Sequence, residues 1–263
     1  KAATIAGPAL GGLIYMLGPV AAYAAGAVCF VIAGLALSSI HLHAHAVPAR
    51  QPMSLESLFS GIAFIVKRPV ILGALSLDLF AVLLGGATAM LPIYARDILM
   101  TGPEGLGLLR AAPAVGAVLI SLALLRIRLA RHVGRKLFAS IAVFGAATVV
   151  FGISRSFTLS FVALAVLGAA DMVSMVIRQS LVQLKTPEGM RGRVGAVNSV
   201  FTGTSNQLGQ FESGVVAAWL GAVASVVIGG AGTLLVAALW IYWFPALWKI
   251  DRLTTDNDPE TSA

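Results

Sequence analysis

Long apolar runs separated by short polar connections dominate the sequence. Most runs are about 20 residues long, which is the length an α-helix needs to cross a bilayer. A transmembrane β-barrel would instead need strands of about 10 residues with alternating character. We therefore predict an all-α polytopic membrane protein with eight transmembrane helices. The predicted spans cover residues 2–17, 20–40, 70–94, 107–126, 137–154, 158–184, 195–218 and 223–246.

One polar interruption divides the spans into two and six. Residues 41–53 contain three histidines and two prolines, and residues 54–66 then carry apolar side chains at helical spacing. We predict a linker at 41–69, on the cytoplasmic side, whose amphipathic helix lies in the membrane interface. The expected parts are two helices at 1–40, this linker, a six-helix bundle at 70–250 and a tail at 251–263. The first run is short, so we expect the chain to begin inside a helix.

Composition agrees with a membrane protein and suggests its orientation. Charged residues make up 11% of the chain and mean hydropathy is +0.92, whereas about 25% charged residues is typical of soluble domains. The net charge of +7 reflects Lys and Arg in short connections, which set topology, so no nucleic-acid partner is expected. Fourteen of these cations fall on one side, which we assign as cytoplasmic together with the C-terminus. Only Arg96, Arg110 and Arg155 fall on the other.

Four charged side chains lie inside predicted spans, more than one helical turn from either end. Each costs about 2.5–3.5 kcal/mol near the centre of a lipid-facing helix, so each should face the bundle interior or a wet cavity. Helical rise places Asp78 about 12 Å and Arg178 about 10 Å from the cytoplasmic ends of their spans. Asp171 lies about 10.5 Å from Arg178 on a similar face, too far for direct pairing. Glu212 lies near the outer end of its span, where water is close.

The span at 195–218 is the most polar. Asn198, Thr202, Ser205, Gly209 and Glu212 recur at spacings of three and four residues, and further amides widen the stripe at Asn206, Gln207 and Gln210. Such a stripe either lines a water-filled cavity or forms hydrogen bonds between helices, with glycines at 203, 209 and 214 allowing close approach. Both interpretations remain open.

The sequence contains no recognisable catalytic motif. There is no phosphate-binding glycine loop, no nucleophile elbow and only one cysteine, Cys29. The histidines at 41, 43 and 45 lack thiolates or acids nearby, so we favour a solvated loop over a metal site. We expect no enzyme activity, no cofactor and no metal.

Several short motifs resemble the major facilitator superfamily, in its branch of enterobactin-exporter-like siderophore and drug efflux proteins. They are Gly7-Pro8-x-x-Gly11-Gly12, Thr186 to Val194 followed by Asn198-Ser199, Asp78-Leu79-Phe80, and Arg178 to Leu181, with a partial gating motif at Gly134-Arg135-Lys136. The match would cover the last eight of the superfamily's helices, with the first four absent. The resemblance implies a proton-coupled exporter of a small amphiphilic molecule in the bacterial inner membrane. The alternative is a non-transporting fragment or scaffold that needs a partner to supply the missing helices.

The resemblance also implies roles for the membrane-embedded charges. It makes the spans that carry Asp78 and Arg178 cavity-lining, so we predict that these two side chains pair. The pair would either belong to the pathway of substrate and protons or only fix helix register. Asp171 is our candidate for proton coupling, since a buried carboxylate without a nearby cation can take up a proton. The alternative is an Asp171 held in one ionisation state by hydrogen bonds. Gly7, Pro8, Gly11, Gly12, Gly134 and Arg135 would serve helix packing and gating.

Overall fold

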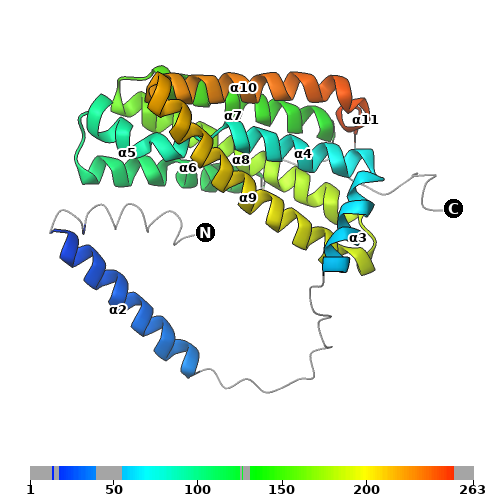
Figure 1. The fold of residues 1–263 in the computed structure, drawn as a ribbon, viewed down its shortest axis with the longest axis horizontal. Helices are drawn as coiled ribbons and strands as arrows, with labels where there is room; N and C mark the ends of the chain where they lie inside the picture. Colours follow the sequence, from blue (N-terminus) through cyan, green and yellow to red (C-terminus); the bar gives the residue numbers. More distant parts are fainter. Residues whose placement is uncertain (1–13, 15–17, 40–54, 125, 127–130, 252–263) are drawn as a thin grey trace.

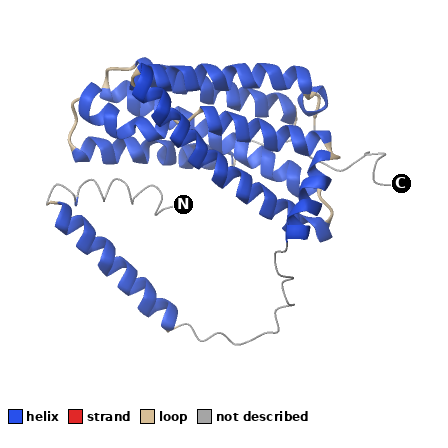
Figure 2. Ribbon diagram, viewed as in Figure 1, coloured by secondary structure: helices blue, strands red, loops and turns tan. Residues whose placement is uncertain are grey.

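A computed structural model describes residues 14, 18–39, 55–124, 126 and 131–251, and every regular element in this part of the chain is a helix (Figures 1 and 2). The helices are α2 (Pro19–Ser38), α3 (Leu55–Val66), α4 (Pro69–Leu84), η1 (Ala87–Met90), α5 (Leu91–Ile93), η2 (Tyr94–Ile98), α6 (Pro103–Leu124), α7 (Val133–Ile153), α8 (Phe157–Lys185), α9 (Glu188–Leu220), α10 (Ala222–Trp243) and α11 (Pro245–Trp248). The all-α class predicted from the sequence is confirmed for these residues.

Six stretches in the described part are long and apolar enough to cross a membrane. They are Val20–Ser38, Pro69–Ile98, Pro103–Leu124, Val133–Ile153, Phe157–Lys185 and Ala222–Trp243. The predicted span at 195–218 is helical within α9, but its polar side chains keep it out of this set. Apart from residue 14, the predicted span at 2–17 lies outside the described residues. The count of eight therefore remains a prediction.

The helices from α4 to α10 form one bundle. Helix α8 packs against α6 and α7, α7 packs against α10, and α9 crosses the bundle diagonally against α4 and α10 (Figure 1). Buried apolar side chains gather near each end, around Leu77 and Ile177 at one end and around Tyr94 and Phe151 at the other. Helix α2 lies apart from this bundle, and its apolar side chains are largely exposed (Figure 1). Such a surface requires lipid or other helices around it.

The span that begins at Pro69 is broken at Gly85-Gly86. Helix α4 ends there, and the chain continues as the 3₁₀ turn η1, the short α5 and the π-helical η2. A side chain at Gly86 would overlap Ser213 of α9, so the close crossing of α9 requires the missing Cβ. The sequence predicted one uninterrupted helix over 70–94, because apolar residues continue through the break.

Helix α9 begins earlier than the sequence predicted. The predicted spans leave residues 185–194 as a connection, but only Thr186 and Pro187 separate α8 from α9. Pro187 has the extended backbone of a helix N-cap, and Glu188 in the first turn favours a helix start. The basic residues of this region, including Arg191 and Arg193, therefore lie on the first two turns of α9.

Four contacts lie at the end of the bundle where the basic residues gather. Arg193 Nη1 donates to Ser60 Oγ of α3 at 3.2 Å, and Gly61 of α3 packs against Val197 of α9. The predicted helix at 54–66 therefore exists as α3 and rests on α9, while its place in the membrane interface remains a prediction. At the same end Gly134 N–H donates to Ile250 O at 3.0 Å, and the Arg135 guanidinium lies 6.0 Å from the ring centre of Trp248.

Candidate functional site

A buried ion pair joins α4 to α8. Arg178 Nη1 donates to Asp78 Oδ1, and the two residues are only 6% and 5% exposed. The pairing predicted from their matching depth, and from the cavity-lining place that the family resemblance implies for their spans, is therefore present. Burial makes the pair interdependent, because removing either partner leaves an uncompensated charge in the bundle.

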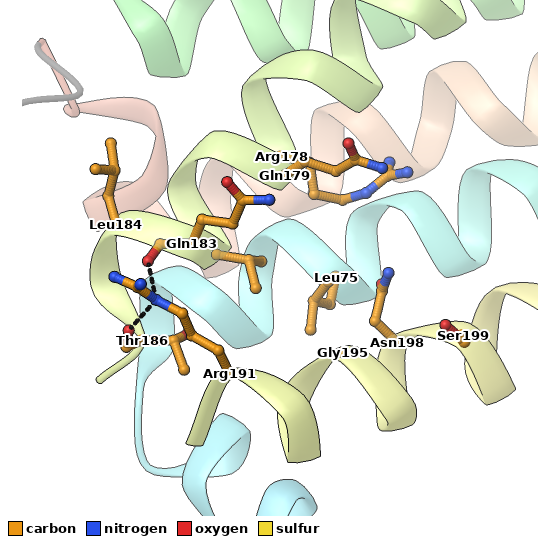
Figure 3. A pocket seen from close by; sticks show the side chains of 11 residues that line it. Leu75, Arg178, Gln179, Gln183, Leu184, Thr186, Arg191, Gly195, Asn198 and Ser199 are labelled. Atoms are coloured by element: carbon orange, nitrogen blue, oxygen red, sulfur yellow. Dashed lines mark hydrogen bonds between the residues drawn. The ribbon is translucent and has the colours of Figure 1, made fainter. Parts of the chain in front are cut away.

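The pair stands between two cavities. Asp78 lines an apolar cavity of about 120 Å³ between α3, α4 and α9. Arg178 lines a larger, more polar cavity of about 520 Å³, which lies between α8 and the first half of α9 (Figure 3). We call this larger space the inner cavity. Leu75 and Asn198 line both cavities, so the pair and these two side chains form part of the partition.

The inner cavity is rich in hydrogen-bond donors. Besides Arg178 it is lined by Arg191 and by the amides of Gln179, Gln183 and Asn198. Arg191 is held in place because its Nε–H is shared between Gln183 O and Thr186 O, each at 3.2 Å (Figure 3). None of the eleven described residues that line the cavity carries a carboxylate.

Two polar atoms at the inner cavity have unmet hydrogen-bonding capacity. Among the described residues, Arg178 Nε and Thr186 Oγ1 are buried and have no hydrogen-bond partner. Buried polar groups are nearly always paired in folded proteins, because an unmet group retains its full cost of desolvation. Two such groups at one cavity therefore mark it as a place where a polar ligand or water completes the structure.

A second polar cavity, the outer cavity, lies farther along the bundle. Its volume is about 400 Å³, and its lining includes Asp171, Arg110, Asn206 and Gln210 together with the break at Gly85-Gly86. Asp171 also interacts electrostatically with Asp78. The acid nominated from the sequence for proton coupling therefore lines a cavity, and it is half-buried rather than enclosed in the core.

Arg110 is the functional candidate that the sequence did not single out. The sequence places it among the cations of the outer side, in the first turn of a span that begins at residue 107, but α6 begins at Pro103 and so carries Arg110 about 10 Å into the helix. Asp171 therefore shares its cavity with a cation, contrary to the expectation that it lies away from one. The signal was present in the sequence, because Pro103 at the first helical position followed by Glu104 is a typical helix start.

The polar residues of α9 fall into two groups, because some line cavities and others pack against neighbouring helices. Asn198 faces the inner cavity, Thr202 faces the apolar cavity and Asn206 and Gln210 face the outer cavity.

The other members of the stripe differ. Ser205 Oγ donates to Leu79 O of α4 at 3.2 Å, and a Cβ at Gly209 would lie 2.7 Å from Leu83 O, so these two positions serve helix packing. Gly203 and Gly214 have no such neighbour within 4 Å. Gln207 and Glu212 line neither polar cavity.

Some predicted positions fall outside the described residues. They include the motif positions Gly7, Pro8, Gly11 and Gly12 and the histidines at 41, 43 and 45. Of the proposed packing and gating positions, Gly134 and Arg135 are described, and both contact the C-terminal segment around α11. Among the described residues, no group of three or more His, Cys, Asp or Glu side chains could hold a metal ion.

Comparison with known proteins gives a consistent assignment. Enterobactin exporter EntS of Escherichia coli O1:K1 / APEC is 28% identical over 244 residues, which are 90% of this chain and 56% of that protein. Enterobactin exporter EntS of Shigella boydii serotype 18 is 26% identical over 242 residues, with the same coverage of 90% and 56%. The chain thus spans about half the length of the curated relatives it matches. No solved structure matches it.

The family description covers almost the whole chain. The model of a major facilitator family described as transmembrane secretion effector matches residues 2–261. The family and the relatives are transporters rather than enzymes, which confirms the expectation that this chain is not an enzyme. The chain therefore belongs to the transmembrane secretion effector family of the major facilitator superfamily.

Proposed function

We propose that this chain forms the part of a secondary active exporter that holds the substrate pathway. The observation that carries the proposal is the Asp78–Arg178 pair, buried in an apolar bundle beside polar cavities. Ionisable groups inside membrane helices are costly, and where they persist they commonly mark substrate or ion pathways. A purely structural bundle needs neither polar cavities nor a buried charge pair.

The spacing of the polar groups supports a route along one face of the bundle. Asn198 at the inner cavity and Gln210 at the outer cavity are twelve residues apart on α9, about 18 Å along the helix. The Asp78–Arg178 pair lies beside the inner part of this face. A solute moving between the two cavities would therefore pass polar side chains of α9 over much of the thickness of the hydrocarbon core.

Protons are the proposed coupling ion, and Asp171 is their proposed carrier. A carboxylate that lines a cavity can exchange protons with water, and the presence of Arg110 in the same cavity gives it a cation whose attraction changes with its protonation. Uptake of a proton by Asp171 would release Arg110 from that attraction and alter the charge presented to a solute.

The substrate class is proposed from the cavities and the relatives together. The relatives are named as exporters of enterobactin, and the inner cavity has a volume within the usual range for small-molecule sites. We propose a small amphiphilic molecule, siderophore-like or drug-like, as the substrate of this chain.

The proposed location is the bacterial inner membrane with the C-terminus in the cytoplasm. The start of α7, the α8–α9 connection and α11 gather at one end of the bundle, whereas α5 and the α7–α8 connection lie toward the other (Figure 1). The first group carries most of the basic residues, whereas Arg96 follows α5 and Arg155 lies in the α7–α8 connection. An excess of Lys and Arg marks the cytoplasmic side of short connections.

Transport into inverted proteoliposomes under an imposed pH gradient tests the proposal. The chain is assayed as it stands and together with any sequence that precedes Lys1 in its gene. Substrate accumulation that collapses when the gradient is dissipated would support a proton-coupled exporter. Accumulation that is indifferent to the gradient would contradict the coupling, and no accumulation by either form would favour the fragment or scaffold alternative.

A further inference from the structure

We propose that the inner cavity is a binding site for an anionic group, a carboxylate or phosphate carried by the transported molecule or by a lipid. This inference deepens the proposed function, since it assigns a chemical class to one part of the same pathway. It rests on the guanidinium groups of Arg178 and Arg191, the unmet buried donor at Arg178 and the absence of a carboxylate among the described lining residues.

The charge balance at the inner cavity favours an anion. Arg178 is neutralised by Asp78, but that carboxylate lines the apolar cavity on the other side of the partition. Arg191 faces one acid, Glu188, whose Oε1 lies 3.5 Å from Arg191 Nη1 and whose side chain is 90% exposed. A pair this exposed is weak, because water and salt screen it. The inner cavity therefore presents positive charge that is only partly compensated.

The unused N–H donors at the inner cavity also favour an anion. The shared bond from Nε to Gln183 O and Thr186 O anchors Arg191 at the rim and leaves most of its five N–H groups to other partners. The buried Nε–H of Arg178 has no acceptor among the described residues. Guanidinium groups bind carboxylate and phosphate oxygens through paired, charge-assisted hydrogen bonds. An oxyanion beside Arg191 would satisfy donors that the protein itself does not, and Arg178 adds positive charge from another part of the cavity wall (Figure 3).

The cavity wall is suited to such a group. The amides of Gln179, Gln183 and Asn198 can turn their NH₂ ends toward an oxyanion, and Thr186 Oγ1 has an unused hydrogen-bonding capacity. Figure 3 shows that these side chains come from both α8 and α9. The space of about 520 Å³ exceeds a single small ion, so the anionic group would be one end of a larger molecule.

Equilibrium binding with matched probes tests the inference. The chain is reconstituted in phosphatidylcholine nanodiscs, and binding of radiolabelled benzoate is compared with binding of its uncharged isostere benzamide, without any gradient. We expect saturable benzoate binding that Arg191→Ala weakens at least about tenfold, that Arg191→Lys weakens less, and that benzamide does not reproduce. Arg191 is chosen because its side chain is half-exposed, so its replacement should leave the bundle folded. Arg155→Ala, which removes an exposed cation at the opposite end of α8, is the matched control.

Each outcome decides the inference. Equal binding of benzamide and benzoate, or an unchanged affinity in Arg191→Ala, would overturn it, and so would the lack of saturable benzoate binding up to about 10 mM. A second set of nanodiscs containing phosphatidylglycerol separates the two sources of the anion. If this lipid displaces benzoate from the wild-type chain and is retained less by Arg191→Ala in native mass spectrometry, the anionic group is a lipid headgroup. Anion binding without transport would refute the proposed function alone, whereas transport without anion binding would refute this inference alone.

Discussion

Removing one member of the Asp78–Arg178 pair should destabilise the bundle far more than removing both. Their side chains are 6% and 8% exposed, so little water reaches either charge once its partner is gone. Breaking a buried pair in this way costs about 3–5 kcal/mol, whereas replacing both members with apolar side chains of similar size is often neutral or stabilising. We therefore expect Arg178→Leu to lower the free energy of unfolding by about 3–5 kcal/mol, or roughly two to four powers of ten in the folded-to-unfolded ratio.

The assay is SDS-induced unfolding from mixed micelles, followed by tryptophan fluorescence and circular dichroism. The double variant Asp78→Leu/Arg178→Leu should regain most of the loss. Arg96→Leu is the control, because Arg96 forms an ion pair with Asp97 at 3.5 Å whose side chains are 89% and 58% exposed. Such an exposed pair contributes at most about 1 kcal/mol and is expected to give a small change here.

Two results would contradict the roles expected of this pair, one for the single variants and one for the double variant. If Arg178→Leu costs no more than Arg96→Leu, the pair is hydrated and the argument from burial is wrong. If the double variant regains both stability and pH-driven transport, the pair only fixes helix register. Regained stability with lost transport would place the two charges in the pathway.

Three further changes address packing, a buried hydrogen bond and proton coupling. Gly209→Leu should destabilise the α4–α9 contact by about 1–3 kcal/mol in the same unfolding assay, because its Cβ would collide with the α4 backbone, while Gly214→Leu, which has no neighbour within 4 Å, should have little effect. Tyr94→Phe removes the 2.6 Å hydrogen bond to Gly152 O from a fully buried side chain and should lower the unfolding free energy by about 0.5–1.5 kcal/mol. Asp171→Asn should abolish accumulation driven by a pH gradient in proteoliposomes, and intact accumulation would remove Asp171 as the proton carrier.

The pairing of Asp78 with Arg178 could be predicted because helical rise gives the depth of each residue in the membrane and the family resemblance implies that both spans line one cavity. Both residues lie in uninterrupted apolar runs with basic residues at the cytoplasmic ends, so counting from those ends gave matching positions. Arg110 was missed for the opposite reason. Its span was predicted to begin at residue 107, which leaves Arg110 in the first turn. The helix begins four residues earlier, at the Pro103–Glu104 signal.

The cavities could not be predicted from the sequence. A polar stripe on α9 is equally compatible with water and with a neighbouring helix, and only the crossing of α9 over α4 assigns Ser205 to packing and Asn206 to a cavity. The break at Gly85-Gly86 had a local signal in its two adjacent glycines. Hydropathy continues through them, however, so the pattern favoured a single helix.

That break divides the span from Pro69 to Ile98 into two helical segments, so this membrane crossing is not one continuous helix. The inner segment, α4, packs on α9 and α10, and the outer segment comprises η1, α5 and η2. Because the regular α-helical ladder stops at the bond from Gly85 N–H to Ala81 O, bending there disturbs fewer backbone hydrogen bonds than bending elsewhere in the span. The two halves of this membrane crossing are therefore held by separate sets of backbone hydrogen bonds, and the joint between them forms part of the wall of the outer cavity.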